Sequence, residues 1–399
     1  MGSVGKAIRL FGIHAGLFLC ACSSAPTPMP ITIPVEAPRP RRPVSTASAA
    51  SVQIDQIRKS FQLPSLAIAE FQDGRMVEAG FSGLRKLGAP ARIQPDDQFH
   101  LGSCTKAMTA TLIGMLVEEG RVFWNEPLSE IFPDMKMDPA FRDVTVEMLS
   151  SHRGGISARI MPLLSASLWR RLEDPALSPT AGRALFARAV LGVPPEAKPG
   201  LRYIYGNGGY VVLGAIIDRV SGMSWESFIQ ERLFTPLRMQ SCGFGPPGTI
   251  DAEVPDQPWG HVLREGKLVP VAPNFQGDYP PFLNSAARVH CSLPDWAKFL
   301  QMHSDGFNGK KELLLEPQSF VKLHTPYPGQ EYTYGGWIRM EREWAGGPVL
   351  THRGSNTFSS SQVWIGPLKN LIFVGASGAD NQETEAAMTE SMDYLLRQL

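Results

Sequence analysis

The sequence predicts an α+β fold in which an antiparallel sheet is flanked by helices and carries an inserted, mainly helical subdomain. Two observations support this prediction. Strand-like segments occur at residues 66–81 and again after residue 334. Between them, above all over residues 140–235, the apolar residues recur at helical spacing. Strands at both ends with helices between them indicate one sheet that is built from segments distant in the sequence.

The first strands are expected to form a hairpin. Residues 66–71 and 76–81 are strand-like, and Asp73-Gly74 between them is a typical two-residue hairpin turn. A helix is expected over residues 105–119, because apolar residues recur there every three or four positions and Gly120 follows as a stop signal. The hairpin and this helix lie at the start of the predicted globular domain.

A second helix is expected over residues 210–220, where Gly222 closes it. After residue 334 the pattern returns to short apolar segments that are typical of strands. The predicted C-terminal strands cover residues 334–340, 349–352, 361–365 and 371–374.

The N-terminus has the composition of an export signal. Lys6 and Arg9 precede an apolar stretch that is too short to cross a bilayer as a stable helix, so residues 1–21 are interpreted as a signal peptide. Ala21 followed by Cys22 resembles the processing site of a bacterial lipoprotein, with Cys22 as the acylated residue. A plain secretory signal with incidental cysteines is the alternative.

Residues 22–51 are rich in proline, serine, threonine and alanine, and they are predicted to form an extended tether. Order is expected from Val52, so residues 52–399 form the predicted globular domain. Together with the lipoprotein signal, this organisation predicts a protein of the bacterial cell envelope. It would face the periplasm and reach the membrane through its N-terminal lipid anchor.

Charge and cysteine content narrow the function further. Lysine plus arginine and aspartate plus glutamate both total 38, and no basic excess indicates nucleic-acid binding. Beyond the anchor, Cys104, Cys242 and Cys291 remain. An odd number in an exported protein cannot all pair, and no C-x-x-C spacing indicates a metal site. Buried free thiols are the default expectation, and a disulfide between Cys242 and Cys291 stays open.

Ser103 and Lys106 form the first candidate catalytic pair. Ser103 lies at the predicted start of a helix, where unpaired N–H groups favour a developing negative charge. Lys106 follows one turn later on the same face. A serine hydroxyl needs a base beside it, and a lysine can serve if burial lowers its pKa. Taken alone, the spacing is common, and an N-cap serine beside a surface lysine is the simpler interpretation.

Two later segments add further polar groups. Tyr205 and Asn207 flank one glycine, so both side chains can leave the same tight loop, the phenol to shuttle a proton and the amide to orient a substrate. A glycine-rich turn with a packed tyrosine is the alternative. Near the C-terminus, His352 ends a predicted strand, Gly354 allows close approach of a ligand, and the N–H of Ser355 can bind an oxyanion.

Together, Ser-x-x-Lys at Ser103, Tyr-x-Asn at Tyr205 and His-x-Gly at His352 resemble the serine β-lactamase and penicillin-binding-protein superfamily. Within it, the chain is similar to the branch of class C β-lactamases, D-alanyl-D-alanine carboxypeptidases and esterases. The resemblance covers the predicted globular domain and implies a β-lactamase/transpeptidase-like fold. It implies an acyl-enzyme on Ser103, proton transfer by Lys106 and Tyr205, substrate positioning by Asn207, and no metal or organic cofactor.

The same resemblance assigns the oxyanion hole to the N–H groups of Ser103 and Ser355, and it gives Cys104 a structural role. The third motif of the β-lactamases and peptidases usually begins with lysine, and here it begins with His352. Because side chains alternate along a strand, we expect His352 to face the cleft and Arg353 to face away. This favours esterase or D-aminoacyl/peptidase-like activity on a small-molecule or peptidoglycan-derived substrate. A true β-lactamase, a cell-wall D,D-carboxypeptidase and a catalytically silent envelope binding protein remain alternatives, and the oligomeric state stays open.

Overall fold

The computed structural model describes residues 49–158, 164–274, 277–311 and 313–399. The predicted signal peptide, the predicted acylation site Cys22 and most of the predicted tether lie outside these residues. The first helix, α1 (Ala49–Ser60), begins before the predicted start of order at Val52. The boundary differs because Ala50 is already buried in the fold.

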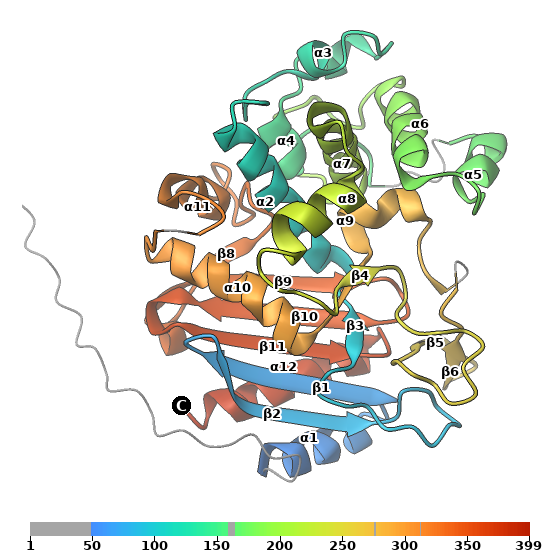
Figure 1. Ribbon diagram of the computed structural model, residues 1–399, viewed down its shortest axis with the longest axis vertical. Helices are drawn as coiled ribbons and strands as arrows, with labels where there is room; N and C mark the ends of the chain where they lie inside the picture. The colour runs from blue at the N-terminus through green and yellow to red at the C-terminus, as the bar shows by residue number, and fades with distance from the viewer. Residues whose placement is uncertain (1–48, 159–163, 275–276, 312) are drawn as a thin grey trace, which may run out of the picture. The chain divides into compact units, whose positions relative to one another are not determined.

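A six-stranded antiparallel sheet forms the centre of the fold (Figure 1). Its order, β2-β1-β11-β10-β9-β8, places the N-terminal hairpin beside the C-terminal strands, as predicted. Asp73 and Gly74 make the hairpin turn with φ values of 51° and 72°, as a two-residue turn requires. The strands are β1 (Ser65–Gln72), β2 (Arg75–Gly83), β8 (Ile338–Arg342), β9 (Gly347–Ser355), β10 (Ser360–Gly366) and β11 (Leu371–Ser377).

The strand that was predicted to begin at Tyr334 begins at Ile338 instead. The chain turns just before it, where Gly336 has a φ of 77°. The turn is closed by Thr333, whose backbone N–H donates to the carbonyl oxygen of Trp337 at 2.7 Å. Glycine permits this backbone conformation, so the strand starts after the turn.

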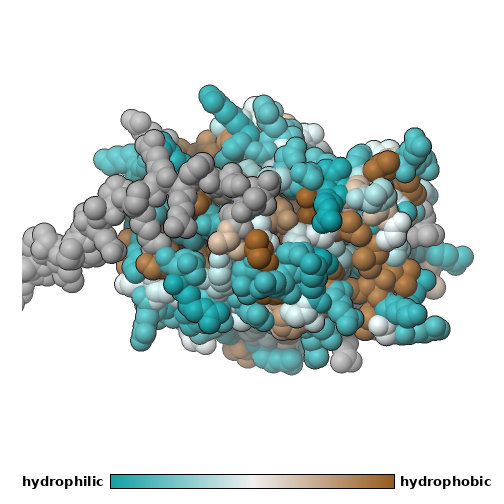
Figure 2. All heavy atoms as spheres, turned by 90° about the horizontal axis from the view of Figure 1, so that it is seen from below, coloured by the Kyte–Doolittle hydropathy of each residue, from teal (hydrophilic) through white to brown (hydrophobic). Residues whose placement is uncertain are grey.

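Helices cover both faces of the large sheet. The side chain of Ile68 on β1 packs with α1 and α12 (Gln382–Leu396), whereas its neighbours Ala67 and Ala69 belong to the main core on the other face. There α10 (Leu293–Phe307) packs across the sheet (Figure 1). Seen from below, the molecule presents hydrophilic side chains interspersed with hydrophobic ones, which gather on the right of the view (Figure 2).

The middle of the chain is mainly helical, as predicted, and Figure 1 shows these helices gathered beyond one edge of the sheet. They are α2 (Thr105–Glu118), α3 (Leu128–Ile131), α4 (Val146–Ser150), α5 (Ala166–Leu172), α6 (Pro179–Leu191), α7 (Gly208–Ser221), α8 (Trp225–Ile229), α9 (Asn284–Ala287) and α11 (Pro317–His324). The remaining strands are β3 (Gln98–His100), β4 (Gly243–Phe244), β5 (Gly260–Arg264), β6 (Lys267–Val271) and β7 (Val289–Ser292). The predicted stop signals Gly120 and Gly222 both have positive φ at the ends of α2 and α7.

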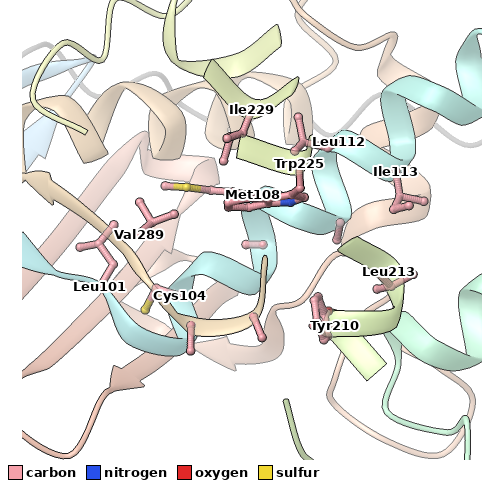
Figure 3. Packing of buried hydrophobic residues seen from close by; sticks show 14 of the residues in the cluster. Leu101, Cys104, Met108, Leu112, Ile113, Tyr210, Leu213, Trp225, Ile229 and Val289 are labelled. Carbon is pink, nitrogen blue, oxygen red and sulfur yellow. The ribbon is translucent and has the colours of Figure 1, made fainter. Parts of the chain in front are cut away.

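Helix α2 is buried along nearly its whole length. Figure 3 shows Met108, Leu112 and Ile113 of α2 surrounded by side chains of other elements, among them Tyr210 of α7 and Trp225 of α8. Burial on all sides holds the first turn of α2 rigidly in place. This matters because that turn carries the candidate nucleophile.

Cys242 and Cys291 are joined by a disulfide. The pairing that the sequence left open is therefore present, and the default expectation of buried free thiols was wrong for these two residues. Cys104 is a buried free thiol, as expected. Among the residues that the structure describes, no helix is long and apolar enough to cross a membrane.

Candidate active site

Ser103 lies in a short turn that leads into α2. The turn is a 3₁₀ segment, η1 (Gly102–Cys104), in which Gly102 has a φ of 51°. A Cβ atom at Gly102 would lie 2.2 Å from the backbone nitrogen of Ser355 on β9, so this approach requires glycine. The turn with Ser103 and the third sequence motif are therefore in direct contact.

Lys106 lies under Ser103 and is completely buried. Its Nζ donates three hydrogen bonds, to Ser103 Oγ at 2.9 Å, to Asn207 Oδ1 at 2.8 Å and to the carbonyl oxygen of Ala286 at 3.0 Å. Burial lowers the pKa of Lys106 to about 7, since the ammonium has lost its hydration. A large fraction of Lys106 is therefore neutral near pH 7, and a neutral amine beside a serine hydroxyl can act as its base.

The second motif joins this pair through the loop that precedes α7. Asn207 is the N-cap residue of α7 and holds Lys106 through its side-chain oxygen. The ring of Tyr205 lies 5.1 Å from Lys106 Nζ, and its hydroxyl is hydrogen-bonded to Ser103. Tyr205 is 38% exposed as a residue, and so forms part of the rim, yet burial around its hydroxyl raises its pKa. Tyr205 is therefore a neutral phenol near pH 7, which suits proton relay rather than a resting tyrosinate.

The third motif lies on β9, where the side chains of His352 and Arg353 point to opposite faces, as predicted. His352 is buried 6.3 Å from the ring of Tyr205, while Arg353 points away and pairs with Asp380 and Glu385. The Nδ1–H of His352 donates to the carbonyl oxygen of Arg353 at 2.7 Å, so its Nε2 is an acceptor, and no partner is recorded for it among the described residues. Burial lowers the pKa of His352 to about 3, and the ring is neutral at neutral pH.

Gly354 and Ser355 complete the third motif. A Cβ atom on Gly354 would lie 1.9 Å from the carbonyl oxygen of Leu101, so no other residue fits between β9 and the turn with Ser103. The hydroxyl of Ser355 donates to Asp380, which leaves its backbone N–H as the group that can serve a substrate. The backbone N–H groups of Ser103 and Ser355 thus belong to two segments in contact, as an oxyanion hole requires.

Two neighbours of these motifs have structural roles, Cys104 as predicted and His152 in addition. Cys104 is buried, and burial raises the pKa of its thiol to about 12, which makes it unreactive. His152 adopts a φ of 58° and packs against the ring of Tyr205 at 4.4 Å. Its Nδ1 accepts a hydrogen bond from the backbone N–H of Gly206 at 3.4 Å, which supports the loop of the second motif.

Two contributors to the site were not predicted from the sequence. The carbonyl oxygen of Ala286 holds Lys106, and the carboxylate of Asp380 holds Ser355. A backbone carbonyl leaves no trace in residue type, and Asp380 is one acidic residue among many after β11. Among the described residues, no group of three or more His, Cys, Asp or Glu side chains is placed to hold a metal ion. A nucleophile, a buried amine and paired N–H donors are the parts that acyl transfer requires.

Comparison with known sequences identifies relatives of this chain. Penicillin-binding protein 4 from Amycolatopsis lactamdurans is 26% identical over 334 residues, which cover 80% of this chain and 82% of that protein. The unguisins hydrolase ungD from Aspergillus violaceofuscus is 28% identical over 261 residues, which cover 62% of this chain but only 43% of the hydrolase. The part of this chain that matches the hydrolase therefore corresponds to less than half of the length of that protein.

Solved structures show the same fold. The octameric penicillin-binding protein homologue from Pyrococcus abyssi superimposes with a TM-score of 0.68 at 26% identity, over 87% of this chain and 77% of that one. The penicillin-binding protein from Bacillus halodurans gives a TM-score of 0.67 at 19% identity, over 86% and 98% of the two chains. A model of the Beta-lactamase family matches residues 53–394. The chain is a serine hydrolase with a β-lactamase/transpeptidase-like fold, and it belongs to the Beta-lactamase family.

Proposed function

We propose that this serine hydrolase is an esterase or amidase for acyl groups that carry no carboxylate close to the scissile bond. One observation carries the proposal, the lack of a free cation in the third motif: His352 is neutral, and Arg353 is turned away and paired with Asp380. The Ser355 hydroxyl is also bound to Asp380. A substrate carboxylate would therefore meet a neutral ring near an acidic group, whereas carboxylates are bound by charged donors.

The rim of the site supports a substrate with apolar parts. Leu201, Tyr203 and Tyr205 follow one another closely in the loop before α7, and they are 69%, 41% and 38% exposed. The ring of Tyr203 packs at 5.7 Å from His152, so the rim is built on fixed aromatic contacts. Exposed aromatic side chains at a cleft favour ligands that bring hydrophobic or planar groups.

In the proposed reaction, neutral Lys106 takes the proton of Ser103 as Oγ attacks the carbonyl carbon. The charge that develops on the carbonyl oxygen is met by the N–H groups of Ser103 and Ser355, each lowering the barrier by about 3 kcal/mol. The proton then passes from Lys106 through Tyr205 to the leaving alcohol or amine, and the carbon–leaving-group bond breaks. Water attacks the acyl-enzyme in the same way, and its proton is returned to Ser103.

Rate measurements on three substrates test the proposal. We expect kcat/KM for p-nitrophenyl butyrate to exceed that for nitrocefin and for a D-Ala-D-Ala peptide, and Ser103→Ala to abolish the reaction. A mass increase on Ser103 in the intact protein would identify the acyl-enzyme. Turnover of nitrocefin or the peptide alone would contradict the esterase assignment.

Substitution of His352 tests the reason for this preference. His352→Lys places an ammonium where the third motif is neutral, so we expect it to raise kcat/KM for nitrocefin relative to the ester. His352→Gln is the matched control, because it removes the imidazole without adding charge. An equal effect of both variants on the two substrates would show that charge at this position does not select the substrate.

A second candidate is a true β-lactamase or a cell-wall D,D-carboxypeptidase that acts on peptidoglycan. The likeness to Penicillin-binding protein 4 over 80% of the chain favours it. In that case the wild-type protein would turn over nitrocefin or the D-Ala-D-Ala peptide in preference to the ester. The same substrate panel therefore decides between the two candidates.

The cellular location is proposed from the sequence. A signal peptide over residues 1–21 and acylation of Cys22 would place the enzyme in the bacterial envelope, facing the periplasm. Metabolic labelling with an alkyne fatty acid should mark the wild-type protein and leave Cys22→Ala unmarked. Recovery of an unlabelled wild-type protein from the soluble periplasmic fraction would favour a plain secretory signal instead.

A further inference from the structure

We infer that Asp278 is a positioning residue that ties together the two backbone segments of the oxyanion hole. Its side chain is completely buried, and it lies on a connecting segment between β6 and the short turn Pro281–Leu283. None of the three sequence motifs contains it. Each of its two carboxylate oxygens contacts one further residue. One of these residues holds the segment that carries Ser103, and the other holds the segment that carries Ser355.

One oxygen of Asp278 is connected to the segment with Ser103. His100 Nε2 lies 3.0 Å from Asp278 Oδ2, and the backbone N–H of Gly102 donates to His100 Nδ1 at 3.1 Å. A ring nitrogen that accepts an N–H carries no hydrogen, so the proton of the neutral ring is on Nε2 and is donated to Asp278. The carboxylate therefore fixes the tautomer of His100, and His100 fixes the peptide between Leu101 and Gly102, one residue before Ser103.

The other oxygen of Asp278 is connected to the segment with Ser355. The amide of Asn356, the next residue, donates from Nδ2 to Asp278 Oδ1 at 3.1 Å. Asn356 Oδ1 in turn accepts the backbone N–H groups of Phe358 at 3.1 Å and Ser359 at 2.8 Å. Asn356 is thus held from both ends, and with it the backbone at Ser355.

The charge of Asp278 is itself held constant. Burial opposes its ionisation, but the interactions with His100 and Arg288 outweigh it and lower the pKa of Asp278 to about 2. Arg288 Nε lies 2.9 Å from Asp278 Oδ2 and its Nη1 donates to Asn284 at 2.6 Å, so the arginine is also fixed. The carboxylate therefore accepts all its hydrogen bonds as an anion at neutral pH.

This arrangement positions the oxyanion donors without touching a substrate. The donors act only when both N–H groups aim at the same oxygen, and a misplacement of 1 Å can reduce the rate about 100-fold. Loss of the carboxylate would free the segments of Ser103 and Ser355 to shift relative to one another. The cost would appear in the rate of acylation rather than in the ability of the cleft to hold a substrate.

Labelling of Ser103 by a fluorophosphonate tests the inference independently of the natural substrate, because its P=O oxygen occupies the oxyanion hole. We expect Asp278→Asn to slow labelling about 100-fold. Asp295→Asn is the matched control: Asp295 is another buried carboxylate, which accepts hydrogen bonds from the N–H and hydroxyl of Ser241 and, among the described residues, has no hydrogen bond to a residue of the three motifs. In the Asp295→Asn variant, the rate at which Ser103 is labelled should stay near the wild-type value, even if the substitution lowers Tm.

Two substitutions of His100 keep the inference testable if Asp278→Asn does not fold. Asn places its oxygen close to the position of Nδ1 and keeps an acceptor for Gly102, whereas Gln places its amide close to Nε2 and keeps a donor for Asp278. His100→Asn should therefore label faster than His100→Gln. For p-nitrophenyl butyrate, kcat should fall in both while KM changes little. The inference would be overturned if the labelling rates of all four variants simply followed their Tm values. It would also be overturned if His100→Gln were labelled faster than His100→Asn.

Discussion

Replacing Lys106 by methionine should make the protein more stable while it abolishes catalysis. Lys106 is completely buried and carries a pKa of about 7 in the folded state, against 10.5 for an ordinary lysine. Below about pH 7 the folded protein therefore contains a desolvated ammonium. Methionine has a similar length and fills the same space without a charge.

The expected gain follows from the pKa difference. A difference between 10.5 and about 7 corresponds to a cost of about 5 kcal/mol for the charged form. The variant also loses three hydrogen bonds, to Ser103, Asn207 and the carbonyl of Ala286. Each lost bond reduces the expected gain in stability by about 1 kcal/mol. The methionine variant should thus be more stable by about 2 kcal/mol at about pH 6.

The sign of the pH dependence is fixed by the same pKa. Between about pH 7 and 10.5 the unfolded chain binds a proton on Lys106 that the folded protein has released, so wild-type stability rises with pH across that window. The advantage of the variant should therefore shrink from about pH 6 to about pH 9 in urea unfolding. Fluorophosphonate labelling of Ser103 should fall at least about 1,000-fold. A variant that is destabilised equally at both pH values would refute the reasoning.

Three further outcomes are expected. The value of kcat/KM should rise with pH through about 7, because Lys106 must be neutral in the free enzyme; a profile that is flat between about pH 5 and 9 would argue against Lys106 as the base. Tyr205→Phe should lower kcat about 100-fold with little change in Tm, as measured on the ester, because it removes a proton relay. Replacing Cys242 and Cys291 by serine should cost about 4 kcal/mol in unfolding free energy, as the disulfide closes a loop of 49 residues, while Ser103 labelling at low temperature persists.

Much of the fold and the core of the site could be predicted because they depend on local patterns. The hairpin of β1 and β2 follows from a two-residue turn between alternating segments, and α2 follows from apolar spacing with a glycine stop. Ser103 and Lys106 share a face because they lie one turn apart. That Asn207, 101 residues later, meets Lys106 could be inferred only from the resemblance of three motifs to one superfamily.

The parts that could not be predicted depend on contacts between distant segments. The sequence contains 38 acidic residues, and nothing in its local pattern distinguishes Asp278 from the others. Its partners His100, on β3, and Asn356, just after β9, lie 178 and 78 residues away, and only the tertiary fold brings all three together. The disulfide could not be assigned for the same reason, since the pairing of β4 and β7 that places Cys242 near Cys291 is a tertiary contact.

The site needs an anionic carboxylate for positioning and a neutral lysine for catalysis, and these needs conflict if the two groups meet. A carboxylate in contact with Lys106 would favour the ammonium and raise its pKa above the working range. The structure separates them: Asp278 is neutralised by Arg288 and acts through His100, whereas the acceptors around Lys106 are a hydroxyl, an amide and a backbone carbonyl. Uncharged acceptors stabilise the ammonium less than a carboxylate would, so burial decides its pKa. A carboxylate placed beside Lys106, for instance by Asn207→Asp, should therefore shift the pH profile of kcat/KM upward.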